Sequence, residues 1–263
     1  VRVAALPYLD RLEGGEAVPV LTRLLRVSGE PKGDELALAQ AAFAALGRLP
    51  GAAASDALVG AWNALEQGTL PGVLELDVES AAEARSGTEP AWGERLVRRR
   101  TALAGVDAER NPVWRFALDG GNAERGGRVF RENPTVQCLR CHKVGTEGGI
   151  VGPDLSKVGA RLSRAELLQS IVDPNARIAA GFETVVLTMK SGDTHAGTVK
   201  AETVDGVELD EVEGDSGTTR RVVLPKSEIA RRDRGPSAMP EGLAQQLGRF
   251  ELRDLVAYLA GLK

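Results

Sequence analysis

The stretch Cys138-Leu139-Arg140-Cys141-His142 dominates this sequence of 263 residues. Its spacing is C-x-x-C-H, which places two thiols on one side of a short turn and an imidazole directly after them. Two thiols at this spacing add across the two vinyl groups of one haem, and the histidine then binds the iron. The sequence has only 2 Cys and 2 His, and three of these four side chains lie in the motif. We therefore expect one covalently attached haem c.

Three other uses of the two cysteines are weaker. A thioredoxin-like redox pair expects a preceding strand and a βαβ context, whereas the segment 133–135, Asn-Pro-Thr, and a glycine-rich loop flank this motif. A zinc site needs four ligands, and the motif plus His195 supplies them only if the adjacent Cys141 and His142 bind the same ion. A disulfide between the two cysteines would close a strained ring.

The composition is that of an ordinary globular protein, long enough for two domains. It is 43% hydrophobic and 27% charged, with a net charge of −4, so nothing indicates a nucleic-acid partner or an anionic membrane surface. No apolar run approaches the length of a membrane span. Because the first residue is Val1 and not Met, we expect a fragment or processed product of a larger protein. Haem attachment to C-x-x-C-H is an exported chemistry in bacteria, so we expect a periplasmic or otherwise extracytoplasmic location.

Residues 1–105 are predicted to form a helical domain, because apolar residues recur at helical spacing between Gly and Pro breaks. The predicted inward faces are Val18, Leu21, Leu24 and Leu25, then Leu36, Ala39, Phe43 and Leu46, then Leu58, Ala61, Trp62 and Leu65. Ser55 is the expected N-cap of the third helix, Pro71 begins a fourth, and a fifth begins near Pro90. Recurrence at about twenty residues predicts HEAT-like stacked pairs, with an irregular bundle as an equal alternative.

Residues 106–263 are predicted to form a second, mainly α domain, after a linker at 107–112. Short strands at 182–232, with a hairpin turn at 191–193, predict a small β-barrel or sheet inserted into it. A helix at 123–131 carries Gly126 and Phe130 on one face. Another helix begins at Ser163, and a third follows Gly242. The last helix carries Leu252, Leu255, Val256 and Leu259 at i, i+3, i+4 and i+7, and we expect it to cross the Gly126/Phe130 helix and close the haem pocket.

A haem held by His142 has one open axial position. A strong sixth ligand makes an electron carrier, whereas an open position makes a gas-binding or peroxidatic site. The candidates are Met189, His195 and Met239. Met189 lies in a strand-like run, where methionine usually fills a core, and His195 follows a turn. Met239 lies in an irregular loop with two prolines, which holds a side chain rigidly, and is the preferred ligand.

Several motifs of the second domain resemble one family. They are Gly126-x-x-x-Phe130, Cys138-x-x-Cys141-His142, Gly152-Pro153-Asp154-Leu155, Gly159-x-Arg161, Leu168-x-x-Ile171-x-x-Pro174-Asn175, Ser237-x-Met239-Pro240 and Asp254-Leu255-x-x-Tyr258-Leu259. Through these motifs residues 118–263 resemble the cytochrome c-type haem-binding domain of the Pirellula/Verrucomicrobium type. The resemblance implies a class I cytochrome c core with a β insert.

The resemblance also implies roles for single residues. The implied haem-binding residues are Cys138, Cys141, His142, Pro153, Arg161 and Met239. The cysteines form the thioethers, His142 is the proximal iron ligand and Met239 the distal one. The Pro153 carbonyl accepts the Nδ1 proton of His142, and Arg161 pairs with a haem propionate.

We therefore predict a monohaem electron-transfer module and not an enzyme in its own right. It would relay electrons from a fused or partner dehydrogenase to another carrier, since domains of this family often follow helical repeats and a β-propeller dehydrogenase-like domain. The alternative is a haem peroxidase or gas-binding sensor with a displaceable sixth ligand. A third possibility makes the helical half a scaffold and the haem merely structural.

Overall fold

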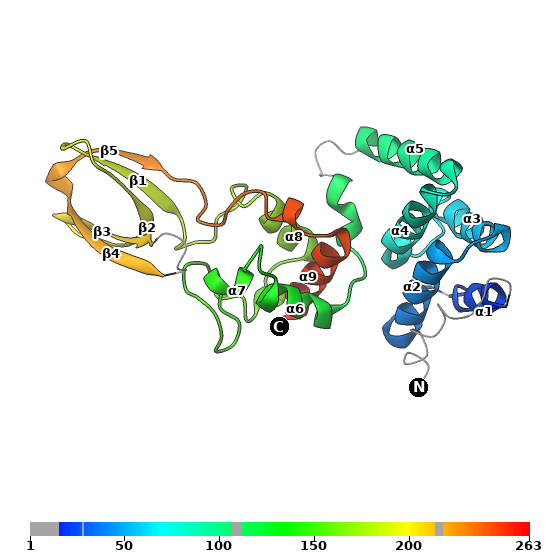
Figure 1. Cartoon of the computed structure of the whole chain (residues 1–263). Helices are drawn as coiled ribbons and strands as arrows, with labels where there is room; N and C mark the ends of the chain where they lie inside the picture. Colours follow the sequence, from blue (N-terminus) through cyan, green and yellow to red (C-terminus); the bar gives the residue numbers. More distant parts are fainter. Residues whose placement is uncertain (1–15, 28, 107–111, 214–217) are drawn as a thin grey trace. The chain divides into compact units, whose positions relative to one another are not determined.

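The computed structural model describes residues 16–27, 29–106, 112–213 and 218–263 (Figure 1). The chain divides into two compact units, Val1–Gly120 and Gly121–Lys263, and each is described by itself. The linker predicted at 107–112 lies outside the described residues except for Pro112. The predicted domain boundary after residue 105 stays a prediction. Over the described residues, no helix is long and apolar enough to cross a bilayer.

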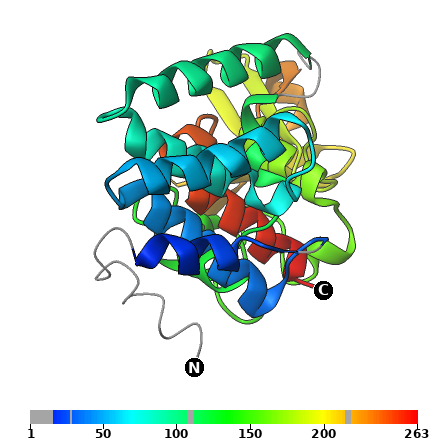
Figure 2. The ribbon, with the colours of Figure 1, turned by 90° about the vertical axis from the view of Figure 1, so that its right-hand side faces the viewer.

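The first unit is helical throughout its described part. Its elements are α1 (Ala17–Leu24), α2 (Gly33–Arg48), α3 (Ala52–Glu66), η2 (Gly72–Leu74), α4 (Glu75–Ser86), α5 (Pro90–Val106) and η3 (Pro112–Ala117). Each helix packs against the next, and α2 also packs against α4 (Figures 1 and 2). The five helices predicted for residues 1–105 are therefore present, while their HEAT-like character stays a prediction.

The predicted apolar faces form the core of this unit. Trp62 and Leu58 of α3 and Phe43 of α2 are almost completely buried. The ring of Trp62 meets that of Trp92 from α5 edge-on, with centroids 5.8 Å apart and planes at 70°, a geometry that aromatic pairs prefer. The helical periodicity therefore identified most of the inward side chains correctly, while Leu24, Leu25, Leu36 and Ala61 are only half-buried.

Ser55 does not cap α3, and that prediction was wrong. The helix begins three residues earlier, at Ala52, because Gly51 adopts a left-handed φ of 98° and turns the chain directly after Pro50. The Ser55 hydroxyl lies inside the helix and donates a hydrogen bond of 2.6 Å to the carboxylate of Glu89. Ser55 therefore bonds a side chain of another segment and not a backbone N–H at the start of its own helix.

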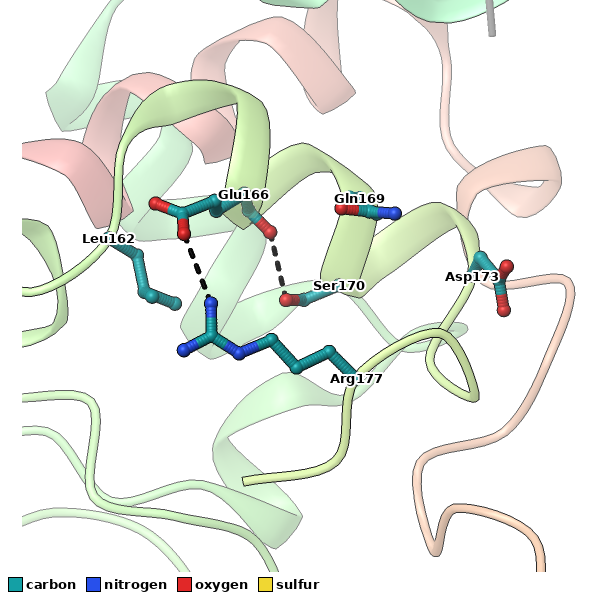
Figure 3. Close-up of a pocket in the computed structure, with 6 residues that line it drawn as sticks. All are labelled: Leu162, Glu166, Gln169, Ser170, Asp173 and Arg177. Atoms are coloured by element: carbon teal, nitrogen blue, oxygen red, sulfur yellow. Dashed lines mark hydrogen bonds and ion pairs between the residues drawn. The ribbon is translucent and has the colours of Figure 1, made fainter. Parts of the chain in front are cut away.

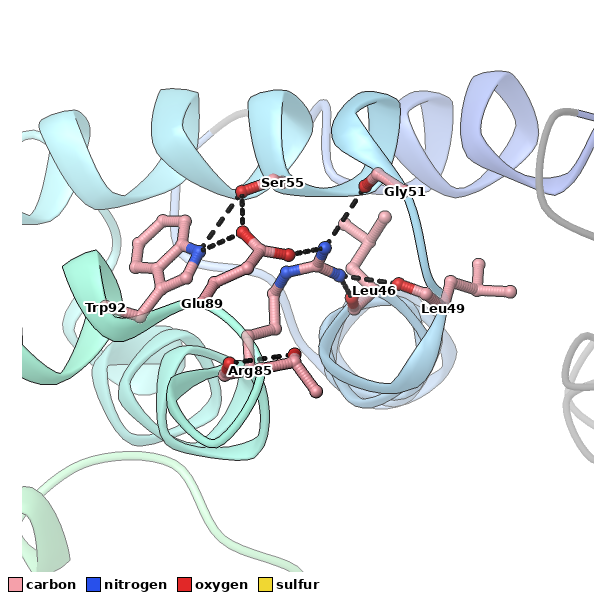
Figure 4. Close-up of polar contacts among 8 residues, drawn as sticks. Leu46, Leu49, Gly51, Ser55, Arg85, Glu89 and Trp92 are labelled. Atoms are coloured by element: carbon pink, nitrogen blue, oxygen red, sulfur yellow. Dashed lines mark hydrogen bonds and ion pairs between the residues drawn. The ribbon is translucent and has the colours of Figure 1, made fainter.

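Glu89 belongs to a polar network around the buried guanidinium of Arg85 (Figure 4). Arg85 is 3% exposed. Its nitrogens donate to the backbone carbonyls of Leu46 at 2.8 Å, Leu49 at 2.6 Å and Gly51 at 3.1 Å, and it also pairs with Glu89. All three carbonyls come from the end of α2 and the turn that follows it. Arg85 therefore supplies donors at a helix end, where backbone oxygens lack a full set of helix partners.

The second unit combines helices with a sheet. Its elements are α6 (Ala123–Glu132), α7 (Cys138–Cys141), η4 (Val158–Ala160), α8 (Arg164–Val172), β1 (Thr184–Met189), β2 (Thr194–Glu202), β3 (Gly206–Val212), β4 (Thr219–Pro225), η5 (Lys226–Glu228), β5 (Ile229–Arg234), η6 (Ala244–Gln246) and α9 (Arg249–Gly261). Ser163 caps α8 as predicted, in a capping box with Glu166. The three predicted helices of this unit are all present.

Helices α6 and α9 cross at Gly126, as predicted. A Cβ atom at Gly126 would overlap the backbone oxygen of Asp254 and lie 2.8 Å from the Cβ of Tyr258. Only glycine lets the two backbones approach this closely. One turn further on, the buried Phe130 ring lies 5.6 Å from the ring of Tyr258. Asp254 also accepts hydrogen bonds from Asn122 N and Arg125 Nε, which fixes the start of α6 against α9.

In its described part, residues 182–213 and 218–234, the insert is an antiparallel sheet of five strands in the order β4-β3-β2-β1-β5 (Figure 1, yellow to orange). Its core consists of Leu187, Met189, Val207, Leu209 and Leu224. Of the two predicted forms, the open sheet is found and the barrel is wrong, because β4 and β5 remain the two edges. The sequence did not predict β5, whose segment Ala-Arg-Arg-Asp-Arg after Ile229 lacks the apolar alternation of a strand. The segment is a strand because its backbone pairs with β1, and not because of its side-chain pattern.

Candidate functional site

The C-x-x-C-H motif forms one helical turn, α7, followed by an extended residue. Gln137 precedes the turn in a left-handed conformation, with φ 41°. The Asn133 side chain accepts hydrogen bonds from the backbone N–H of Thr135 and Val136, which organises the approach to the turn. His142 N donates to Cys138 O at 3.0 Å and closes it. Cysteines three positions apart on such a turn lie on the same face, as attachment to one flat ring requires.

The imidazole of His142 has a fixed orientation. Its Nδ1 lies 3.0 Å from the carbonyl oxygen of Pro153. Burial lowers the pKa of His142, opposed by this hydrogen bond, so a neutral ring donates through Nδ1 and leaves Nε2 as the lone-pair nitrogen. The donor set therefore fits a haem: a neutral imidazole with one free nitrogen, directly after two thiols. The family resemblance implied this hydrogen bond, while the role of Pro153 in a haem site stays a prediction.

A glycine-rich loop packs directly on this turn. Gly149 N donates to Leu139 O and Gly152 N to Cys141 O, at 3.0 and 2.8 Å. A Cβ atom on Gly152 would lie 2.5 Å from Cε1 and 2.7 Å from Nδ1 of the His142 ring, and one on Gly148 would overlap the His142 carbonyl. The glycines therefore let the backbone run against the imidazole itself. The sequence showed a glycine-rich loop beside the motif, but not this direct contact with the imidazole.

The two cysteines are free, half-buried thiols. Burial raises the pKa of Cys138 to about 11 and also raises that of Cys141. Reactive C-x-x-C redox pairs have lowered thiol pKa values, so the environment does not resemble theirs. Among the described residues, no three His, Cys, Asp or Glu side chains are grouped to hold a metal ion. A zinc site built from the motif and His195 therefore has no support here.

The three candidates for the sixth iron ligand have different surroundings. Met189 is buried in the core of the sheet, as methionine usually is. His195, in β2, has its Nδ1 2.7 Å from a carboxylate oxygen of Glu211. Met239 is half-buried in the loop after β5, and its backbone N–H donates to Ser237 Oγ at 3.2 Å. Two candidates thus have other partners within the sheet, and Met239 as the ligand stays a prediction.

Arg161 lies beside the proximal loop. Its guanidinium donates to the backbone oxygen of Asp154 at 3.0 Å, and the side chain is exposed. Hydrogen bonds from Ser156 lower the pKa of the Asp154 carboxyl, so this carboxylate is ionised close to Arg161. Pairing of Arg161 with a propionate stays a prediction.

The sequence analysis assigned no role to Asn175, although the segment Asp-Pro-Asn after a helix is a turn signal. In the structure its side chain bonds Ser237 N and the Glu241 carboxylate, on either side of Met239.

A separate small pocket lies along α8 (Figure 3). Its lining residues are Leu162, Glu166, Gln169, Ser170, Asp173 and Arg177. Arg177 pairs with Glu166 at 3.0 Å, and Ser170 Oγ donates to the backbone oxygen of Glu166. Three of the lining residues, Glu166, Ser170 and Arg177, therefore bond to one another.

Residues 123–213 match the family model described as cytochrome c. The match spans α6, the C-x-x-C-H turn, the glycine-rich loop, α8 and the first three strands of the sheet. It supports a cytochrome c-type domain, which implies covalently bound haem c and a role in haem-based electron transfer. No curated protein matches the chain.

Proposed function

We propose that this chain is a monohaem electron-transfer module that relays single electrons between redox partner proteins. The observation that carries the proposal is the orientation of His142. Its Nδ1 is bonded to the Pro153 carbonyl, so that Nε2 is the available nitrogen, and the imidazole directly follows two cysteines on one turn. This is the donor arrangement of a covalent haem with a proximal histidine.

Each proposed ligand has a defined task. Cys138 and Cys141 would hold the haem through thioether bonds, and His142 and Met239 would bind its iron. When bound, the haem supplies reversible one-electron chemistry, and a thioether ligand opposite an imidazole raises its potential. Arg161 neutralises a propionate. The domain needs no substrate on the iron, so the chain is proposed as a carrier and not as an enzyme.

The proposed partners are a dehydrogenase, fused or separate, as donor and a second carrier as acceptor. The compartment is proposed to be periplasmic or otherwise extracytoplasmic, where haem is joined to this motif. The helical unit is proposed as a HEAT-like scaffold for docking. Within the second unit, the Pirellula/Verrucomicrobium type of domain is proposed from the motifs Gly152-Pro153-Asp154-Leu155 and Ser237-x-Met239-Pro240.

The proposal is tested by producing the chain in a host that matures c-type cytochromes. We expect haem staining on a denaturing gel, because only a covalent cofactor stays attached, and no staining for the double variant Cys138→Ser/Cys141→Ser. The ferric protein should be six-coordinate and low-spin, with a Met–iron charge-transfer band that disappears in Met239→Ala. A colourless product would refute the haem site. A high-spin ferric haem that reacts with peroxide in the unmutated protein would instead favour the peroxidase or sensor function.

A further inference from the structure

We propose that Asn175 is a positioning residue that holds Met239 in place as the distal iron ligand. The inference rests on the proposed function, since it takes Met239 as that ligand. Asn175 lies at the end of α8, in the turn 173–176, where Asp173 Oδ1 accepts a hydrogen bond from Ala176 N and Pro174 is buried. The backbone that carries Asn175 is therefore itself held in place.

The Asn175 amide contacts both ends of the segment that carries Met239. Its Oδ1 accepts a hydrogen bond of 2.7 Å from Ser237 N. Its Nδ2 donates to the carboxylate of Glu241. These two partners are four residues apart, and Met239 is the residue midway between them. One side chain thus connects the segment before and after the methionine.

Further contacts continue the same restraint. Ser237 Oγ accepts a hydrogen bond from Met239 N at 3.2 Å, so the residue bonded to Asn175 also bonds the methionine. Upstream, Thr184 Oγ1 donates to the carbonyl of Pro236, and Gly235 N donates to Thr184 O at 2.9 Å. Residues 235–236 of the loop are therefore bonded to Thr184 at the start of β1, and residues 237 and 241 are bonded to Asn175.

Such restraint matters because methionine is a neutral ligand on a flexible side chain with three rotatable bonds. Its occupancy at iron depends on how much freedom the backbone loses on binding, and a pre-organised loop loses little. An amide suits this place because it accepts at one atom and donates at the other. Aspartate at position 175 would keep the bond to Ser237 but place a second carboxylate against Glu241.

The experiment uses the full-length, haem-loaded protein and its affinity for added imidazole, which must displace the methionine to reach the iron. In Asn175→Ala we expect imidazole to bind roughly 10-fold more tightly, the effect of losing two hydrogen bonds that stabilise the methionine-bound state. The Met–iron charge-transfer band of the ferric protein should weaken in parallel. Glu241→Ala removes one restraint from an exposed side chain and should tighten imidazole binding roughly 3-fold. If Asn175→Ala does not yield haem-bound protein, the imidazole affinity of Glu241→Ala still tests the proposal.

The matched control is Ser163→Ala, which removes the cap at the opposite end of α8. It should lower the melting temperature without changing the imidazole affinity or the band, because it contacts no residue of 237–241. Unchanged imidazole affinity in both Asn175→Ala and Glu241→Ala, with the band intact, would overturn the role of Asn175 alone. Absence of the band in the unmutated protein would overturn Met239 as ligand and Asn175 with it. An equal shift in Ser163→Ala would show a general loss of stability and also overturn the inference.

Discussion

Single atoms decide whether the haem site can form. The Gly152 backbone runs against the His142 ring, and the Pro153 carbonyl next to it accepts from Nδ1. Both features need a residue without a side chain at position 152. In the other unit, the buried guanidinium of Arg85 donates to three backbone carbonyls, of which those of Leu46 and Leu49 belong to buried residues. Glycine is needed at position 152 because it has no side chain, and arginine is needed at position 85 because it has several hydrogen-bond donors.

Gly152→Ala is expected to displace the imidazole of His142. The added methyl group would lie 2.5 Å from Cε1 of the ring, and overpacking of this kind costs about 1–3 kcal/mol. We expect a lower yield of haem-bound protein, measured by haem staining at equal protein load. Gly261→Ala is the control, because a Cβ atom there meets nothing within 4 Å. Equal yields for the two variants would contradict the expectation.

Arg85→Met is expected to destabilise the first unit by about 3 kcal/mol or more, because it leaves buried carbonyls and a carboxylate without their partner. Urea unfolding followed by tryptophan fluorescence measures this, since Trp62, Trp92 and Trp114 all lie in that unit. Arg98→Met is the control, because this arginine is exposed and its ion pair with Glu94 spans 3.9 Å. Equal midpoints for the two variants would show that the network contributes little.

At the scale of the elements, the crossing of α6 and α9 is the contact that frames the second unit. The helices meet at Gly126, and the Phe130 and Tyr258 rings pack beside the crossing. The adjacent Gly127 is different, because a Cβ atom there would lie 3.1 Å from the side-chain end of Arg131 and 3.3 Å from the Tyr258 ring, and not against backbone. A side chain at position 126 would therefore collide with backbone, whereas one at position 127 would meet only side-chain atoms.

Gly126→Ala should destabilise the second unit by about 3 kcal/mol, since its methyl group would force the helices apart. Gly127→Ala should change stability by less than about 1 kcal/mol, because side-chain ends can move and alanine favours the helix. Thermal unfolding of the haem-bound protein, followed by absorbance, compares the two. A Gly126→Ala variant as stable as Gly127→Ala would contradict the close backbone contact.

For the molecule as a whole, each unit has a hydrophobic cluster of its own. The clusters around Trp62 and Leu21 use residues of the first unit only, and the cluster around Leu187 belongs to the sheet. Stability of the first unit can therefore be followed against pH without reference to the haem. Its Glu89 carboxyl has a pKa below the usual 4.5, chiefly because Ser55 donates a hydrogen bond to it, with further donors in Arg85 and Trp92.

A carboxyl whose pKa is lowered by folding contributes stability above its unfolded pKa and loses it as the pH falls through the folded pKa. Glu89→Gln should therefore lower the free energy of unfolding of the first unit at about pH 7, and the difference from the unmutated protein should shrink below about pH 4. Urea unfolding by tryptophan fluorescence at several pH values measures it. Glu94→Gln, at an exposed site, should show no difference at any pH. A Glu89→Gln deficit that persisted unchanged at acid pH would contradict the pKa shift.

Local patterns along the chain were enough to predict the C-x-x-C-H turn, the helices of both units, most of their buried faces and the pairing of the Gly126 helix with the last one. These features depend on local spacing, and an apolar period or a two-residue gap between cysteines is readable along the chain. The folded chain was needed to show that Ser55 bonds Glu89, that Arg85 bonds the end of α2, and that the charged segment 229–234 is a strand. It also joined Asn175 to both sides of Met239. Each of these depends on a partner 34 or more residues away, and no local pattern encodes which distant group will satisfy a polar atom once the chain has folded.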